Sequence, residues 1–171
     1  MLKRMAVLGV CLVALTGCIL QSDQPLFSDR DSSLALGGKS GAAKLESLEK
    51  GEWVAEKDPV TITVKGNHYE ALSEKSTVIL HFVSLGGDDY VLQGTEDGKA
   101  SSYLIAEVKD GVALVRPLAC KDVKQEMKVS RWIRYDGDNC SVPLGSPVKM
   151  IFRTLADAKG EFTSRLSILP Q

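Results

Sequence analysis

The segment from Tyr103 to Arg116 constrains the fold of this chain more than any other part of the sequence. Two β-favouring runs, residues 103–109 and 112–116, are separated by Asp110 and Gly111. An Asp-Gly pair supplies the positive φ angles of a type I′ turn, whose twist matches that of two antiparallel strands. The sequence therefore predicts a tight β-hairpin at this position.

Other short β-favouring runs surround this hairpin. Residues 60–64 alternate between apolar and polar, whereas residues 77–84 are almost continuously apolar, which is typical of a strand buried on both faces. Further runs occupy residues 68–71, 90–93 and 162–169. Turn residues separate neighbouring runs, so the pairing is expected to be mostly antiparallel.

A late helix is predicted over residues 146–160. Ser146 can cap it, Pro147 suits its first turn and Gly160 can end it. Its apolar side chains recur at helical spacing on one face: Val148, Ile151, Phe152 and Leu155. The expected fold is α+β, mainly an antiparallel sheet or small barrel of about seven or eight strands with one C-terminal helix packed on it.

The amino-acid composition excludes a disordered chain and a membrane protein with several spans. The chain has 171 residues, 44% of them hydrophobic and 25% charged, which is ordinary for a globular protein. Its formal net charge of -1 gives no reason to expect nucleic acid as a partner.

The N-terminus has the pattern of a secretory signal. Lys3 and Arg4 precede an apolar run over residues 5–15, which is too short to span a bilayer. The run ends in Leu15-Thr16-Gly17-Cys18, which resembles the lipobox of bacterial lipoproteins. That resemblance implies cleavage before Cys18 and attachment of diacylglycerol, and usually a further acyl chain such as palmitate, to this cysteine. In the Gram-negative lipoproteins that this segment resembles, an Asp after the lipidated cysteine tends to retain the protein at the inner membrane. By that resemblance, Ile19 in this position implies the outer membrane, with the inner membrane as the alternative.

The domain organisation follows from this leader. Residues 1–17 are predicted to be the signal peptide, and residues 18–48 a lipidated N-terminus and flexible tether, because Ser, Asp, Gly, Lys and Ala dominate there. A short helix is possible within it, over residues 42–50. Residues 49–171 form the predicted α+β domain in the periplasm.

Two cysteines remain after Cys11 leaves with the signal peptide and Cys18 takes lipid. In an oxidising compartment, Cys120 and Cys140 are expected to form a disulfide, worth roughly 3 kcal/mol in the loop-entropy model. A metal site is the competing interpretation, but neither cysteine has a paired Cys or His nearby in the sequence. No metal and no cofactor is therefore predicted.

Catalytic candidates are few. His81 lies in the most apolar run and is expected to be a neutral, hydrogen-bonded core residue, whereas His68 lies in a turn-rich stretch and is expected to be exposed. There is no Gly-x-Ser-x-Gly motif, and an enzyme would need one of these histidines beside carboxylates in a cleft. The chain is therefore predicted not to be an enzyme.

A basic cluster is the remaining candidate for an interaction site. It consists of Lys121, Lys124, Lys128, Arg131 and Arg134, interleaved with Trp132 and Tyr135. Such a cluster can contact acidic lipid headgroups or an anionic polymer, although a solvated face has the same composition.

The chain also resembles a group of uncharacterised lipoproteins from alphaproteobacteria. The features that carry this resemblance are the lipobox with Cys18, Pro25-Leu26-Phe27, the hairpin leading into Leu118-Ala119-Cys120, Cys140, and the late helix followed by a strand. The expected function is that of a membrane-anchored envelope lipoprotein with a non-enzymatic binding or structural role toward an envelope protein or polymer. The alternatives are a lipocalin-like carrier of an apolar ligand and an inhibitor of lysozymes or other hydrolases.

Overall fold

The computed structural model describes residues 19–74, 76–96, 100–158 and 160–169. The predicted signal peptide, the lipobox and Cys18 lie outside these residues. Within the described part of the chain, no helix has both the length and the apolar character needed to cross a membrane.

Eight antiparallel strands close into a barrel, in which β12 joins the two ends of the sheet by pairing with both β9 and β2. The barrel strands are β2 (Gly41–Glu49), β4 (Val60–Lys65), β5 (His68–Leu72), β6 (Thr77–Gly86), β7 (Asp89–Glu96), β8 (Ser101–Lys109), β9 (Val112–Pro117) and β12 (Ser164–Ile168). The predicted α+β fold, with a mainly antiparallel sheet or small barrel, is confirmed.

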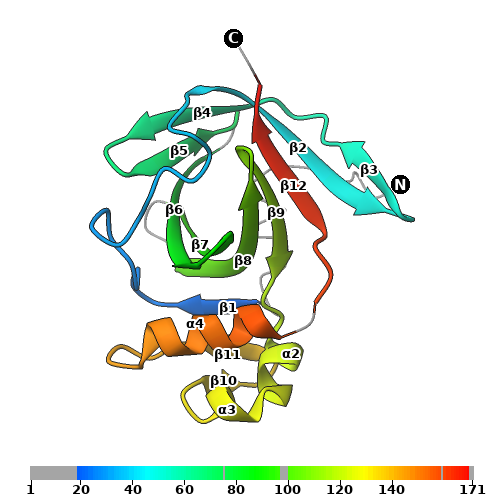
Figure 1. Cartoon of the computed structure of the whole chain (residues 1–171). Coiled ribbons are helices and arrows are strands. Elements are labelled where there is room, and N and C mark those ends of the chain that lie inside the picture. The colour runs from blue at the N-terminus through cyan, green and yellow to red at the C-terminus, as the bar shows by residue number, and fades with distance from the viewer. Residues whose placement is uncertain (1–18, 75, 97–99, 159, 170–171) are drawn as a thin grey trace.

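Further strands and three helices are attached to the barrel. The strand β3 (Glu52–Ala55) pairs with β2, and β1 (Leu20–Ser22) pairs with β8 and with β11 (Asn139–Ser141), which in turn pairs with β10 (Arg134–Asp136). The helices are α2 (Cys120–Gln125), α3 (Met127–Ser130) and α4 (Val148–Asp157). Figure 1 shows α2, α3 and α4 gathered with β1, β10 and β11 at the same side of the barrel.

The hairpin predicted between Tyr103 and Arg116 is present as β8 and β9. Asp110 and Gly111 have φ angles of 52° and 75°, so both residues of the turn are left-handed, as a type I′ turn requires. The strand predicted to be buried on both faces is β6, where Phe82 points into the barrel and Val83 to the outer core.

Two hydrophobic cores share the barrel wall. The inner core lies inside the barrel and contains the fully buried rings of Tyr69 and Phe82, whose centroids are 5.9 Å apart. The outer core lies between the barrel and α4, where Phe27, Tyr103 and Phe152 pack together. The predicted apolar face of the late helix is therefore confirmed as the face that packs on the sheet.

Arg116 joins α4 to the barrel. Its buried guanidinium donates hydrogen bonds to the carbonyl oxygens of Leu155, Ala156 and Ala158, at 2.7, 3.2 and 2.9 Å. These carbonyls are left over at the helix C-terminus, where a positive charge is also favourable. The expected cap at the other end is wrong, because Pro147 is the N-cap and no side chain caps there.

The disulfide between Cys120 and Cys140 is confirmed, with Cα atoms 5.5 Å apart. It links the start of α2 to β11, and both cysteines belong to the outer core.

The flexible tether predicted for residues 18–48 is wrong for its described residues. Ile19 is buried and forms a β-bridge with Ala119, and β1 lies between two other strands. The expected helix over residues 42–50 is instead the barrel strand β2. Its composition favours a helix, but hydrogen bonding to β12, to β4 at its start and to β3 at its end overrides that local preference.

Candidate functional site

Residues 23–40, called the crossing segment below, connect the two cores. Phe27 is buried in the outer core, whereas Leu36 is buried in the inner one. Between them the segment runs along β6, where the amide of Ser33 donates a hydrogen bond to the carbonyl oxygen of Phe82 at 2.8 Å. The hydroxyl of Tyr69 accepts hydrogen bonds from the amides of Leu36 and Gly38 at its far end.

Gln93 on β7 fixes the start of the crossing segment. Its side chain is fully buried, and its Oε1 accepts hydrogen bonds from the amides of Leu26 and Phe27, both at 3.0 Å. Its Nε2 donates to the carbonyl oxygen of Phe27, also at 3.0 Å. Every polar atom of this amide group thus holds backbone of the segment, which sets the position of the residues that follow.

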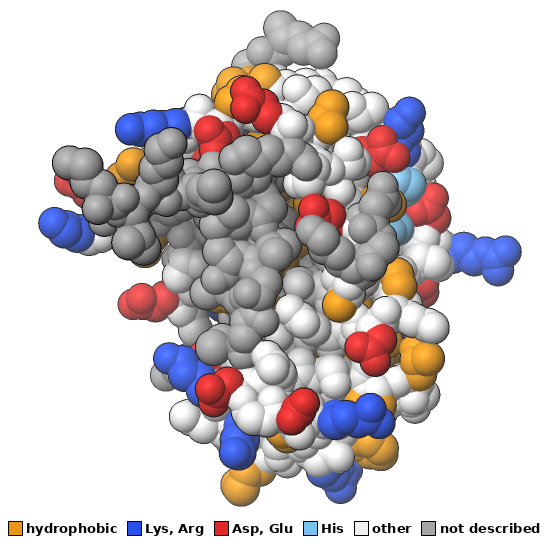
Figure 2. All heavy atoms as spheres, turned by 180° about the vertical axis from the view of Figure 1, so that it is seen from behind, with side chains coloured by type: hydrophobic (Ala, Val, Ile, Leu, Met, Phe, Trp, Pro, Cys, Tyr) orange, Lys and Arg blue, Asp and Glu red, His pale blue; other side chains and the backbone are white. Residues whose placement is uncertain are grey.

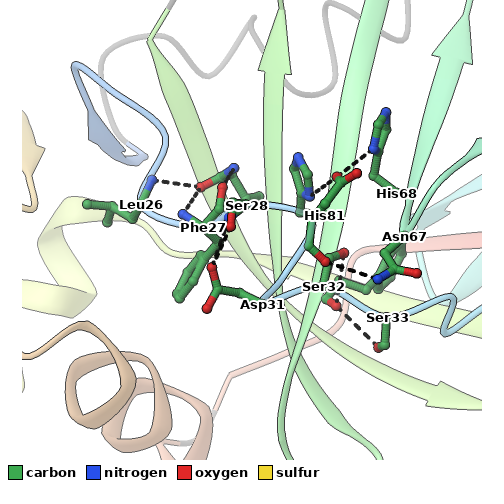
Figure 3. A network of polar contacts seen from close by, with 12 residues as sticks. Leu26, Phe27, Ser28, Asp31, Ser32, Ser33, Asn67, His68 and His81 are labelled. Carbon is green, nitrogen blue, oxygen red and sulfur yellow. Dashed lines mark hydrogen bonds and ion pairs between the residues drawn. The ribbon is translucent and has the colours of Figure 1, made fainter.

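Asp29 in this segment meets both histidines of the chain. Its Oδ1 lies 2.7 Å from Nδ1 of His68 on β5 and 3.7 Å from Nδ1 of His81 on β6. Figure 3 shows His68 and His81 side by side on neighbouring strands and next to the chain that carries Ser28 and Asp31. The two imidazole rings have centroids 5.2 Å apart.

The turn between β4 and β5 makes room for the Asp29 carboxylate. Gly66 has a φ of 57°, and a Cβ atom there would come within 2.9 Å of Asp29 Oδ2. Next to it, the side-chain amide of Asn67 donates a hydrogen bond to the backbone carbonyl of Asp29 at 3.2 Å. The glycine therefore allows both the turn and the close approach of the carboxylate.

His81 is the buried member of the cluster. It is 8% exposed, and its Nδ1 is buried without a hydrogen-bond partner. Burial lowers the pKa of His81, as does the neighbouring His68, while the carboxylates of Asp29 and Asp31 act in the opposite direction. The neutral imidazole is therefore favoured, and its Nδ1 faces Asp29.

No pattern in the sequence predicted that Asp29, His68 and His81 lie together. His68 is partly buried where exposure was predicted, and the Nδ1 of His81 lacks the hydrogen bond expected of a core histidine. Asp29 lay in the presumed tether, 39 positions before His68. One indication was present in the sequence. Side chains alternate along residues 77–84, so the side chains of His81 and Phe82 point to opposite faces of the strand.

The predicted basic cluster forms the surface of the helical side. Lys124, Lys128, Arg131 and Arg134 are exposed, and Trp132 is 37% exposed with the Arg131 guanidinium over its ring at 5.2 Å. Met127 and Leu144, at 85% and 69%, are exposed on the same side. Figure 2 shows Lys and Arg side chains at this end of the molecule, with hydrophobic, Asp and Glu side chains among them. We call these residues, with Lys121, the basic surface.

A hollow of about 600 Å³ adjoins the basic surface. It lies between the end of β9, helix α2 and the chain after α4, and charged groups of both signs, Arg116, Lys121, Asp122 and Glu161, line it.

Comparisons of the chain with family models, with curated proteins and with solved structures found no match.

Proposed function

We propose that the protein is an exported lipoprotein, anchored through Cys18, whose barrel is a non-enzymatic binding module at the periplasmic face of a bacterial membrane. The leader and lipobox motivate the anchor, and Ile19 favours the outer membrane. The disulfide supports export, because such bonds persist in oxidising compartments.

The observation that carries this proposal is the position of Ile19. This residue is buried and bridged to Ala119, the residue just before α2. Ile19 directly follows Cys18 in the sequence, so we propose that a lipid on Cys18 anchors the domain through its helical side. The anchor therefore holds the domain close to the bilayer without a long spacer.

The basic surface has the chemistry to contact that bilayer. Its Lys and Arg side chains complement anionic headgroups, at about 1 kcal/mol for each residue near the surface. Trp132, Met127 and Leu144 can enter the interfacial layer, where tryptophan is favoured. We propose that Lys124, Lys128, Arg131, Trp132 and Arg134 orient the barrel on the membrane, leaving its opposite side free to bind another envelope component.

Metabolic labelling tests the anchor. Cells that express the chain and grow on labelled palmitate should label the wild type and the Cys11→Ala variant but not Cys18→Ala, since only Cys18 survives cleavage as a lipid acceptor. Density-gradient separation of the membranes should place the labelled protein in the outer-membrane fraction. Label on Cys18→Ala, or none on the wild type, would refute the proposal.

A lipocalin-like carrier is the second candidate, because a closed antiparallel barrel of eight strands is compatible with such a binder. Binding of an apolar fluorescent probe that Phe82→Trp weakens would favour it. Against this candidate, Phe82 packs on both Tyr69 and Tyr90 inside the barrel, so side chains fill the region where an apolar ligand would bind.

A further inference from the structure

We propose that Asp29, His68 and His81 form a binding site for a divalent transition metal ion, for which Zn²⁺ is the best chemical match. One ligand atom from each of the three residues lies within 4.8 Å of the others. The chain contains two histidines in all, and the fold brings both to the same carboxylate. This site goes beyond the proposed anchoring function and does not depend on it.

The spacing of the three groups is close to that of a metal centre. Zn²⁺ binds imidazole nitrogen and carboxylate oxygen at about 2.0–2.2 Å in tetrahedral geometry, which puts neighbouring ligand atoms about 3.3 Å apart. The Oδ1 of Asp29 is 2.7 Å from His68 Nδ1 and 3.7 Å from His81 Nδ1, so the two distances lie on either side of that value. The third pair, one nitrogen from each imidazole, lies within 4.8 Å, so movements of the three side chains would bring the ligand atoms around one ion.

The buried Nδ1 of His81 is the second, independent observation. It has no hydrogen-bond partner, although His81 is 8% exposed. Buried polar atoms are nearly always paired, and one without a partner calls for an explanation such as a bound ion. The Nδ1 atom faces Asp29 Oδ1, so a metal ion between the two atoms would satisfy it.

The surrounding residues hold the ligands in place. His68 and His81 project from neighbouring strands of the barrel, which is a rigid support. Asn67 holds Asp29 through its backbone carbonyl, and the missing side chain of Gly66 leaves room for the Asp29 carboxylate. Ligands on such supports need little rearrangement to bind a metal.

The ligand set selects the class of metal. Two imidazoles and one carboxylate suit Zn²⁺ and other first-row divalent ions, whereas Ca²⁺ and Mg²⁺ prefer sites made of oxygen alone. Three protein ligands leave a fourth tetrahedral position open to water or to a ligand atom from a partner.

Metal titration of the full chain tests the site. The protein is purified without a histidine tag in detergent micelles, stripped with a chelator, and titrated with Zn²⁺ by calorimetry and with Co²⁺ by visible spectroscopy. We expect one ion per chain and the visible absorption of four-coordinate Co²⁺. The variants His68→Gln, His81→Gln and Asp29→Asn should each bind at least about tenfold more weakly.

Asp23→Asn, an exposed acid of the same segment, is the matched control and should bind as the wild type does. Should a ligand variant fail to fold, the wild type still decides the question, because Zn²⁺ must perturb the imidazole NMR signals of both histidines. No binding, binding that all three ligand variants retain, or histidine signals that Zn²⁺ leaves unchanged would overturn the proposal. In that case Asp29 and His68 form a hydrogen-bonded pair only.

Discussion

Two basic side chains stabilise the ionised carboxylate of Glu46. Glu46 is buried on β2, and its carboxylate accepts hydrogen bonds from Arg165 at 2.6 Å and contacts Lys44 at 2.9 Å. The hydrogen bonds from Arg165 and from Lys44 lower the pKa of Glu46 from 4.5 to about 2. The guanidinium of Arg165 also lies over the ring of Trp53. This group of side chains therefore ties β2 to β12 where the barrel closes.

The charge of Glu46 should make stability depend on pH. Because its pKa is lower in the folded than in the unfolded chain, the stabilisation is complete above pH 4.5 and is lost as the pH falls toward 2. We expect a loss of about 1–2 kcal/mol, since both partners are partly exposed and screened by solvent. Urea unfolding across this pH range should show a flatter dependence for Glu46→Gln than for the wild type. Glu49→Gln, an exposed acid on the same strand, should behave as the wild type; equal curves for all three proteins would contradict the assignment.

At the scale of elements, the crossing segment shows how a stretch without regular structure becomes ordered. Its backbone groups are satisfied one after another by Gln93, Phe82 and Tyr69, which lie on three strands of the barrel. Phe27 and Leu36 add a buried side chain at each end. The segment is polar in composition. Its backbone groups form hydrogen bonds with the barrel, whereas those of a flexible tether would form them with water.

Replacing Gln93 should loosen this segment. The change Gln93→Leu keeps a similar volume but leaves the amide of Phe27 without an acceptor and its carbonyl oxygen without a donor, at about 1–3 kcal/mol for each buried unsatisfied group. Urea denaturation should therefore show a loss of about 2–4 kcal/mol, and the amide of Phe27 should exchange its hydrogen faster.

The matched control for this prediction is Gln125→Leu, an exposed residue of α2, which should change stability by less than about 0.5 kcal/mol. A Gln93→Leu variant as stable as the wild type would show that the segment is held by its side chains alone.

On the scale of the whole molecule, the chain is a closed barrel with a helical side fastened to it. Closure removes the exposed edges from the barrel strands. The helical side is held by α4, by β1 and β11, and by the disulfide, all of which contribute to the outer core. The N-terminal described residue, the basic surface and the disulfide thus lie on one side, and the proposed metal site lies on the barrel wall.

Removing the disulfide should destabilise this arrangement without opening the barrel. The cysteines are separated by 20 positions, and closing such a loop contributes about 3 kcal/mol in the loop-entropy model. The double variant Cys120→Ala, Cys140→Ala should unfold at correspondingly lower urea concentration while its far-ultraviolet circular dichroism stays that of a β protein.

Reduction by dithiothreitol provides the control. It should destabilise the wild type by a similar amount and leave the double variant unchanged. A wild type that is insensitive to reduction would contradict the contribution assigned to this bond.

The sequence by itself determined the features that depend on short stretches of chain. Alternation and turn residues predicted the strands from Val60 to Arg116, the Asp110-Gly111 pair predicted the hairpin, and the apolar spacing predicted α4. These patterns are reliable because the side-chain periods of strands and helices repeat within a few residues. The pairing of Cys120 with Cys140 followed from the count of cysteines.

Only the tertiary structure decided the rest. The segment that forms β2 has a helical composition, and it becomes a strand because β12 pairs with one edge and β4 and β3 with the other. The order of residues 19–40 and the meeting of Asp29 with His68 and His81 depend on contacts between parts of the chain that are far apart in sequence. Such contacts depend on how the barrel closes and on which residues it buries, so they cannot be predicted from a short stretch of sequence.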